Sequence, residues 1–256
     1  MLTSPRLDIL VVSPHLDDAF FSLGGLLERS RSRRVMVVDV FTTSAFAPRL
    51  KRFVTEKRVI SAVRRREEWR NLRAVRAEST FLGFPEAPLR GYATSFDPPK
   101  WSLEGKCMAS IWLQLTEMVS SARVTFFPLG IGGNLDHLMI ARLGVESLLR
   151  GRGRVMFYED LPYASNLPRL WGMTNPSRIL GMEPMWIPID AISKLKLCLS
   201  YKSQCLPQVP LKIVVYSKLT KAFGGMYERV WRVNCLENFR RSRFAQGMTS
   251  AVSVQA

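Results

Sequence analysis

Residues 9–18 of the chain read ILVVSPHLDD, an apolar run of four residues followed by a polar turn. A short apolar run bounded by a turn is typical of a strand buried on both faces, so we predict a strand over residues 7–13. The turn carries His15, Asp17 and Asp18. In open α/β sheets, ligands bind at the edge formed by the carboxyl ends of the strands. The turn is therefore predicted to lie at a ligand site.

A second stretch, residues 124–137, repeats this pattern, with the apolar run VTFFPL ahead of the turn GIGGNLDH. It ends in Asp136 and His137, and the chain has only one other histidine, His15. A single histidine beside a strand is more often packed or hydrogen-bonded than a metal ligand. Two histidines at equivalent positions, with three aspartates, favour instead a nitrogen-and-oxygen site suited to zinc, with a carboxylate to spare for proton transfer. The residues leave open which aspartate of the first turn would be the ligand.

Strand-like and helix-like segments alternate through residue 160, which favours parallel βαβ units in an α/β fold. The predicted strands cover residues 7–13, 35–42, 80–84, 124–129 and 155–158, and the predicted helices cover residues 19–29, 55–77, 107–119, 138–149 and 191–201. Residues 85–101 hold four prolines and are predicted to form an irregular loop. Residues 212–217 and 226–234 are compatible with strand or helix.

No linker divides the chain, so we expect one domain over residues 1–240 and a disordered tail over residues 241–256. The mean hydropathy is +0.01, and no apolar run approaches the 18 residues of a membrane-spanning helix. Asp8 interrupts the first apolar stretch, so no secretory signal is predicted. The four cysteines show no CxxC spacing, which fits reduced thiols in a cytoplasmic protein.

The net charge of +16 is unusual and unevenly distributed. Residues 49–76 carry eleven Lys or Arg against three Glu. Such a surface attracts phosphates, nucleic acid or anionic lipid, but it is equally well explained as the solvated face of a helix. An apolar stripe of the helix over residues 55–77 would lie opposite, formed by Val59, Ala62, Val63, Trp69, Leu72 and Val75. The chain shows neither interleaved aromatic residues nor a zinc finger, so an anionic small molecule is at least as good a partner as nucleic acid.

Two motifs resemble those of a known family. The run Pro14-His15-Leu16-Asp17-Asp18 resembles the PHPDDE signature of the LmbE-like, or PIG-L, deacetylases, and residues 130–137 resemble that family's second motif, HxDH after a glycine turn. Residues 64–68, 157–164 and 201–204, with Lys196, resemble further blocks of the family. The resemblance covers residues 7–235.

The resemblance implies a Rossmann-like domain and a zinc-dependent hydrolysis that removes an N-acetyl group from an amino-sugar-containing small molecule, in specialised-metabolite biosynthesis. His15, Asp18 and His137 would be the zinc ligands. Asp17 would be the general base, and Asp136 would orient a ligand histidine. Residues 158–163 and the aromatic rings of Trp101 and Trp171 are candidates for the walls of a sugar pocket.

Two departures from the family pattern bear on activity. Asn134 stands where the family usually has a histidine, and Ala19 replaces the glutamate of the first signature. An amide donates a hydrogen bond but no proton at neutral pH, so Asn134 could stabilise an oxyanion while Asp17 delivers the proton. These departures leave open a catalytically impaired homologue that binds a glycan or sugar nucleotide. The net charge leaves open a second alternative, a basic nucleic-acid-associated protein.

Overall fold

The computed structural model describes residues 6–50, 53–165, 179–206, 208–220 and 224–249. Its centre is a seven-stranded sheet in the order β3-β2-β1-β4-β5-β7-β6. The strands are β1 (Ile9–Ser13), β2 (Val35–Asp39), β3 (Glu78–Phe81), β4 (Val124–Pro128), β5 (Val155–Tyr158), β6 (Met182–Pro188) and β7 (Tyr227–Val233). The first five strands are parallel, and β7 runs antiparallel to both β5 and β6. The prediction of an α/β domain with a mostly parallel sheet is confirmed.

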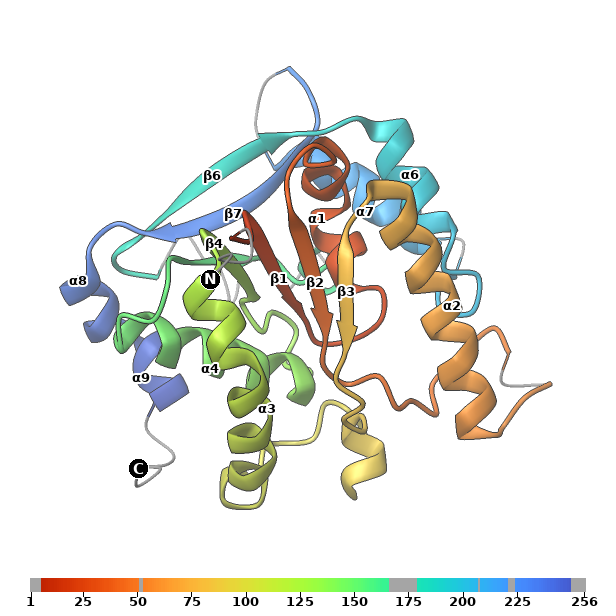
Figure 1. The fold of residues 1–256 in the computed structure, drawn as a ribbon, viewed down its shortest axis with the longest axis horizontal. Coiled ribbons are helices and arrows are strands. Elements are labelled where there is room, and N and C mark those ends of the chain that lie inside the picture. The colour runs from red at the N-terminus through yellow and green to blue at the C-terminus, as the bar shows by residue number, and fades with distance from the viewer. Residues whose placement is uncertain (1–5, 51–52, 166–178, 207, 221–223, 250–256) are drawn as a thin grey trace, which may run out of the picture.

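The helices cover both faces of this sheet (Figure 1). On one side α1 (Asp18–Arg29) contacts α2 (Lys57–Val75) and α6 (Ala191–Leu199), and α6 contacts α7 (Gln208–Leu219). On the other side α4 (Leu135–Leu149) packs against β4, α3 (Trp101–Ser121) and α9 (Arg243–Thr249), and α9 also contacts α8 (Leu236–Arg241). None of the described helices is both long and apolar enough to cross a membrane.

The point at which the strand order changes direction lies between β1 and β4, two adjacent parallel strands near the middle of the sheet. The chain proceeds outward through β2 and β3 on one side of β1, then returns to β4 and proceeds through β5 on the other. The connections after β1 and β4 therefore diverge and leave a crevice at the carboxyl ends of these two strands. Both predicted motifs follow these strands, so the topology brings them together.

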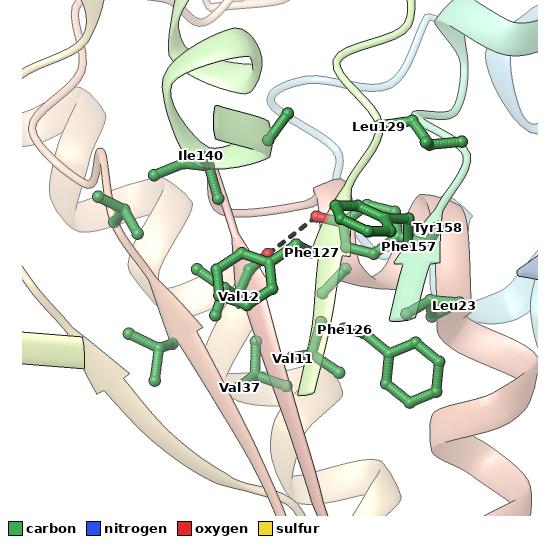
Figure 2. Close-up of a cluster of buried hydrophobic side chains, with 14 of the residues drawn as sticks. Val11, Val12, Leu23, Val37, Phe126, Phe127, Leu129, Ile140, Phe157 and Tyr158 are labelled. Atoms are coloured by element: carbon green, nitrogen blue, oxygen red, sulfur yellow. Dashed lines mark hydrogen bonds between the residues drawn. The ribbon is translucent and has the colours of Figure 1, made fainter. Parts of the chain in front are cut away.

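The core lies between the central strands and the helices. Every residue of β1 is buried, and Phe126, Phe127 and Phe157 of the neighbouring strands pack around it (Figure 2). The hydroxyl of Tyr158 donates a 3.0 Å hydrogen bond to the carbonyl of Val12 (Figure 2). Buried apolar strands of this kind keep the two polar turns at a fixed separation.

The apolar stripe predicted for α2 is largely wrong. Val59 and Trp69 are exposed, whereas only Leu72 and Val75 of the six predicted residues are buried. The remaining buried face of α2 is mainly polar and consists of Ile60, Ser61, Arg64, Glu67, Glu68 and Asn71. These polar groups are tolerated because most of them find hydrogen-bond partners on neighbouring segments, as described below.

The C-terminal region differs from the expectation in two ways. Of the two segments left open between strand and helix, residues 212–217 lie within helix α7 and residues 226–234 contain the whole of β7. Strand β6 was not predicted. The tail expected to be disordered from residue 241 is helical as far as residue 249, because Ala245 and Met248 are buried and α9 packs on α4. Residues 250–256 of that predicted tail lie outside the described residues.

Candidate active site

Three buried side chains from the two turns converge in the crevice. His15 follows β1, Asp18 is the first residue of α1, and His137 lies in the first turn of α4. Asp18 Oδ2 is 3.0 Å from His15 Nδ1 and 3.1 Å from His137 Nε2, and the two nitrogens are 3.3 Å apart. Each residue thus offers one ligand atom to a common point. The three side chains form a candidate metal centre.

The spacing of these atoms suits a small tetrahedral ion. With bonds of about 2.0–2.2 Å, tetrahedral zinc places neighbouring ligand atoms about 3.3–3.6 Å apart, within a few tenths of an ångström of the observed separations. The donor set, two imidazoles and one carboxylate, leaves a fourth position open, as in catalytic zinc sites. The residues present therefore fit zinc.

A carboxylate lies behind each histidine. Asp136 Oδ2 is 2.9 Å from His15 Nε2, and Asp160 Oδ1 is 2.6 Å from His137 Nδ1. Both carboxylates are held in place, since Asp136 also accepts the Ala87 amide and pairs with Arg90, while Asp160 accepts the amide of Ile131. Carboxylates in this position fix the tautomer of an imidazole, so that the opposite nitrogen faces the metal.

Asp160 was expected only as part of the loop over residues 158–163, a candidate for the pocket wall, and its contact with a histidine was not predicted. The usable signal was its position: Asp160 follows β5 as the other two motifs follow β1 and β4. The rule that polar residues at the carboxyl ends of parallel strands gather at the ligand edge places Asp160 near the site, but it does not identify His137 as its partner.

Asp17 stands beside the candidate metal centre without joining it. Its backbone φ of +149° lies outside the conformations that L-residues readily adopt, a form of strain often found at functional sites. Burial raises the pKa of this carboxyl to about 7, a shift that the guanidinium of Arg64 opposes and the charge of Asp18 reinforces. Burial acts in the same sense on Asp18, but His137 and His15 outweigh it and hold the pKa of Asp18 far below its usual range. The pKa values of the two adjacent carboxyls are therefore shifted in opposite directions.

Asn134 caps helix α4 and reaches toward the loop after β5. Its side-chain oxygen accepts the backbone N–H of Asp136 at 3.0 Å, and its Nδ2 donates to the hydroxyl of Tyr163 at 3.3 Å. The ring of Tyr163 meets that of His137 edge-on, with centroids 5.3 Å apart. The departure at position 134 is thus accompanied by a second polar group, the hydroxyl of Tyr163, which the sequence analysis expected only in the pocket wall.

The turn after β1 is supported without the family's glutamate. The hydroxyl of Ser13 donates to the carbonyl of His15 at 2.6 Å and accepts the backbone N–H of Ala19 at 3.2 Å. Ala19 itself is fully buried. A serine at the end of β1 therefore braces this turn.

A cavity of about 200 Å³ opens onto the centre. His15, Asp17, Asp18 and Asn134 line its base, and its walls include the aromatic rings of Phe21, Phe46, Phe96 and Tyr163. Arg64 and Glu86 also line it as a buried ion pair, and Arg64 lies 3.6 Å from Asp17 Oδ1. Arg64 is thus part of the pocket and not of a solvated helix face.

Of the other residues expected in the pocket wall, Trp101 lies elsewhere, in a separate groove between α3 and α4 where Arg142 stacks on its ring. Trp171 lies outside the described residues. The expected role of the loop over residues 158–163 rests on Pro162 and Tyr163, which both line the cavity.

The sequence and the fold were compared with those of known proteins. In Streptomyces fradiae, 2'-N-acetylparomamine deacetylase is 36% identical over 162 residues, which cover 60% of this chain and 57% of the length of that relative. The A40926 pseudoaglycone deacetylase superposes with a TM-score of 0.69 at 22% identity, covering 90% of this chain and 99% of that chain. The zinc-inhibited form of the teicoplanin deacetylase gives 0.68 at 20% identity, with coverages of 88% and 97%. At these identities, the two structural likenesses establish the fold.

The family model described as PIG-L, GlcNAc-PI de-N-acetylase, matches residues 10–148, a segment that contains both turns and the whole candidate metal centre. Because this match spans more than half of the 256 residues, the chain belongs to the PIG-L family.

Proposed function

We propose that the protein is a zinc-dependent hydrolase that removes an N-acetyl group from an amino-sugar-containing small molecule. The observation that carries this proposal is the convergence of His15 Nδ1, Asp18 Oδ2 and His137 Nε2 beside a cavity that is lined by His15, Asp17 and Asp18. A module that only binds sugars has no need for an additional buried carboxyl next to a metal. Membership of the PIG-L family supports the same reaction.

Zinc is the metal that best suits the two nitrogens and one oxygen at these separations. When bound, it would supply Lewis acidity to the acetyl carbonyl and to the attacking water. His15, Asp18 and His137 would hold it, and Asp136 and Asp160 would keep the two imidazoles oriented. With three protein ligands, the bound metal would keep one position for water or substrate.

Asp17 would act as general base and then as general acid. Its carboxylate accepts a proton from water while the water oxygen bonds to the acetyl carbon, and the carbonyl π electrons move onto the carbonyl oxygen. When this oxyanion collapses and the C–N bond breaks, Asp17 returns the proton to the leaving nitrogen. The products are acetate and the free amino sugar. Arg64, 3.6 Å away, holds the carboxylate of Asp17 in place.

The substrate class follows from the lining of the cavity. Aromatic rings suit the apolar faces of a sugar, and the Arg64–Glu86 pair offers hydrogen-bonding groups for its hydroxyls. The relative from Streptomyces fradiae is named for an N-acetylated paromamine, so we place this chain among enzymes of specialised-metabolite biosynthesis. The four cysteines are free thiols, and we assign the reaction to the cytoplasm on that basis.

An acetate-release screen tests the proposal. The purified protein, analysed for metal, is incubated with N-acetylglucosamine, its simple glycosides and 2'-N-acetylparomamine, and acetate and free amine are quantified. We expect about one zinc per chain, as three protein ligands at one open site imply, and equal yields of acetate and amine from at least one substrate. Zinc-loaded protein that binds these sugars but releases no acetate would instead support the impaired, sugar-binding homologue that Asn134 suggests.

A further inference from the structure

In the two hydrogen bonds of the Asn134 side chain, the donor and the acceptor can each be assigned. The backbone N–H of Asp136 can only donate, so the side-chain oxygen of Asn134 must face it, at 3.0 Å. The amide nitrogen of Asn134 is then the group that donates to Tyr163 Oη, at 3.3 Å. Because the Tyr163 oxygen is the acceptor in this contact, its own proton is left to point elsewhere. Tyr163 lines the cavity above the candidate metal centre, so the proton can be directed into it.

The loop after β5 is built to hold this ring in position. The ring packs edge-on against His137, and Phe96 contacts it from the other side with centroids 5.9 Å apart. A Cβ atom at Gly132 would lie only 2.6 Å from the Cβ of Tyr163, and Gly132 has a φ of +97°. Only glycine readily combines this backbone conformation with the close approach of the tyrosine. The second motif and the loop after β5 are therefore matched to each other.

We propose that Tyr163 is a catalytic residue whose hydroxyl donates a hydrogen bond to the acetyl oxygen as that oxygen becomes negative, and that Asn134 is the residue that positions it. The inference rests on the proposed deacetylase function and identifies a donor that this function requires. No proton is transferred by Tyr163, since burial raises the pKa of its phenol above the ordinary value and the hydroxyl remains protonated at neutral pH. Asp17 continues to carry the proton from water to nitrogen.

The chemical need for such a donor arises from Asn134. Its amide nitrogen carries two N–H groups, of which one donates to Tyr163 Oη. Both are neutral donors, and a neutral hydrogen bond to an oxyanion is weaker than one from the charged histidine that the family usually has at this position. A preorganised donor aimed at a developing oxyanion contributes about 10²–10³-fold to kcat. Tyr163 is the described hydroxyl-bearing side chain that both lines the cavity and contacts a candidate metal ligand.

The first test is Tyr163→Phe, which keeps the ring against His137 and removes only the hydroxyl. On a substrate that the parent turns over, we expect kcat to fall by about 10²-fold, with KM and zinc content unchanged. The matched control is Tyr92→Phe, whose hydroxyl accepts the backbone N–H of Lys100 away from the cavity; its kcat should equal that of the parent. An unchanged kcat in Tyr163→Phe would overturn the proposal.

The second test separates positioning from independent action. Asn134→Ser keeps a helix cap but is too short to reach Tyr163. Because Asn134 acts through Tyr163, the double variant with Tyr163→Phe should have a kcat no lower than that of the worse single variant. If the two losses multiply, the positioning role of Asn134 is wrong.

A binding measurement keeps the inference separate from the substrate assignment. Methylphosphonate presents a tetrahedral centre with negative oxygens, and its Kd for the zinc-loaded protein can be measured by calorimetry without turnover. We expect Tyr163→Phe to raise this Kd by about 10-fold or more, the scale of a lost hydrogen bond to a charged group. That result, together with no acetate release by the parent, would retain Tyr163 as an anion donor and reject the proposed substrate class. An unchanged Kd would reject Tyr163 as the donor whatever the parent turns over.

Discussion

At the scale of single residues, the site is organised by pairs of one histidine and one carboxylate. Asp136 lies behind His15, and Asp160 lies behind His137. The family resemblance predicted that Asp136 orients a ligand histidine, but not that its partner is His15 instead of the adjacent His137. It did not predict the second pair, since 22 residues separate Asp160 from His137 and only the pairing of β4 with β5 brings them together. Local motifs identify ligands more readily than the groups that orient them.

Asp160→Asn tests this orienting contact. The amide keeps the size of the side chain but removes the charge that stabilises the Nδ1–H of His137. We expect zinc affinity to fall by about 10–100-fold, the usual effect of losing such a partner. Competition with a fluorescent chelator measures it. The control, Glu183→Gln, removes an exposed carboxylate paired with Arg232, and its zinc affinity should match that of the parent. Equal affinity in Asp160→Asn would show that the contact does not support the metal.

The different roles of the two adjacent aspartates, Asp17 as base and Asp18 as metal ligand, give a second test. Asp17→Asn removes the proposed base but no ligand, so zinc content should persist while kcat falls by about 10²-fold or more. Asp18→Asn weakens a ligand and should lower zinc content first. Metal analysis and acetate release on the two purified variants distinguish these cases. Loss of zinc in Asp17→Asn with retention in Asp18→Asn would mean that the roles are reversed.

At the scale of elements, the five parallel strands and the first helices were predictable from their apolar patterns, whereas β6 was not predicted and the segment of β7 was left open between strand and helix. The strand over residues 155–158 was predicted to the residue, and the helix α1 to within one residue. The position of helix α2 in the chain was predicted correctly, but the face predicted to be buried was wrong. The face that is buried is mainly polar and is held by hydrogen bonds to other segments. Glu67 accepts the hydroxyl of Ser203, Glu68 accepts that of Tyr201, and Asn71 donates to the carbonyl of Leu197. Hydropathy cannot reveal such pairs before the partner segments are known.

The burial of Glu68 makes the free energy of unfolding depend on pH. Burial raises the pKa of Glu68 from its ordinary value of 4.5 to about 8, against the opposing hydrogen bond from Tyr201. The folded chain therefore holds a proton that the unfolded chain releases between these pH values. Its stabilising contribution is full below pH 4.5 and is lost as the pH rises through about 8.

Glu68→Gln, which is neutral at every pH, should flatten this loss. We expect the free energy of unfolding in urea, measured with a chelator present, to decline less between pH 5 and pH 8 in the variant than in the parent. Because the other titrating groups are shared by both proteins, the difference isolates Glu68. Parallel declines in the two proteins would contradict the assignment.

At the scale of the whole molecule, the charge of +16 divides into a buried and an exposed part. Arg64 faces the cavity, whereas Arg66 and Arg70 are exposed, since successive residues turn by about 100° around a helix. The number of these arginines can be read from the sequence, but which of them are buried cannot. Arg64 is buried because it has partners in other segments, namely Ser44, Glu86 and Asp17.

Substitution of the buried Arg64 and substitution of the exposed Arg66 and Arg70 should affect different measurements. Arg64→Gln should lower kcat by about 10²-fold, because Asp17 loses the group that positions it. Arg66→Gln with Arg70→Gln should leave kcat and KM within about twofold and weaken only salt-sensitive binding to duplex DNA. Steady-state kinetics and DNA titrations at two salt concentrations measure both. A large rise in KM for the exposed pair would instead indicate that this surface recruits an anionic substrate.

The central claim is that one zinc ion at His15, Asp18 and His137 supports hydrolysis of an acetylated amino sugar. The most direct measurement is a zinc titration of chelator-treated protein, with acetate release from the best substrate of the screen followed at each addition. The account predicts that activity is absent without metal, rises linearly and reaches its maximum at about one equivalent of zinc, as expected for one site with three protein ligands. Acetate release that persists after complete removal of metal, or that is absent at full zinc occupancy, would contradict it.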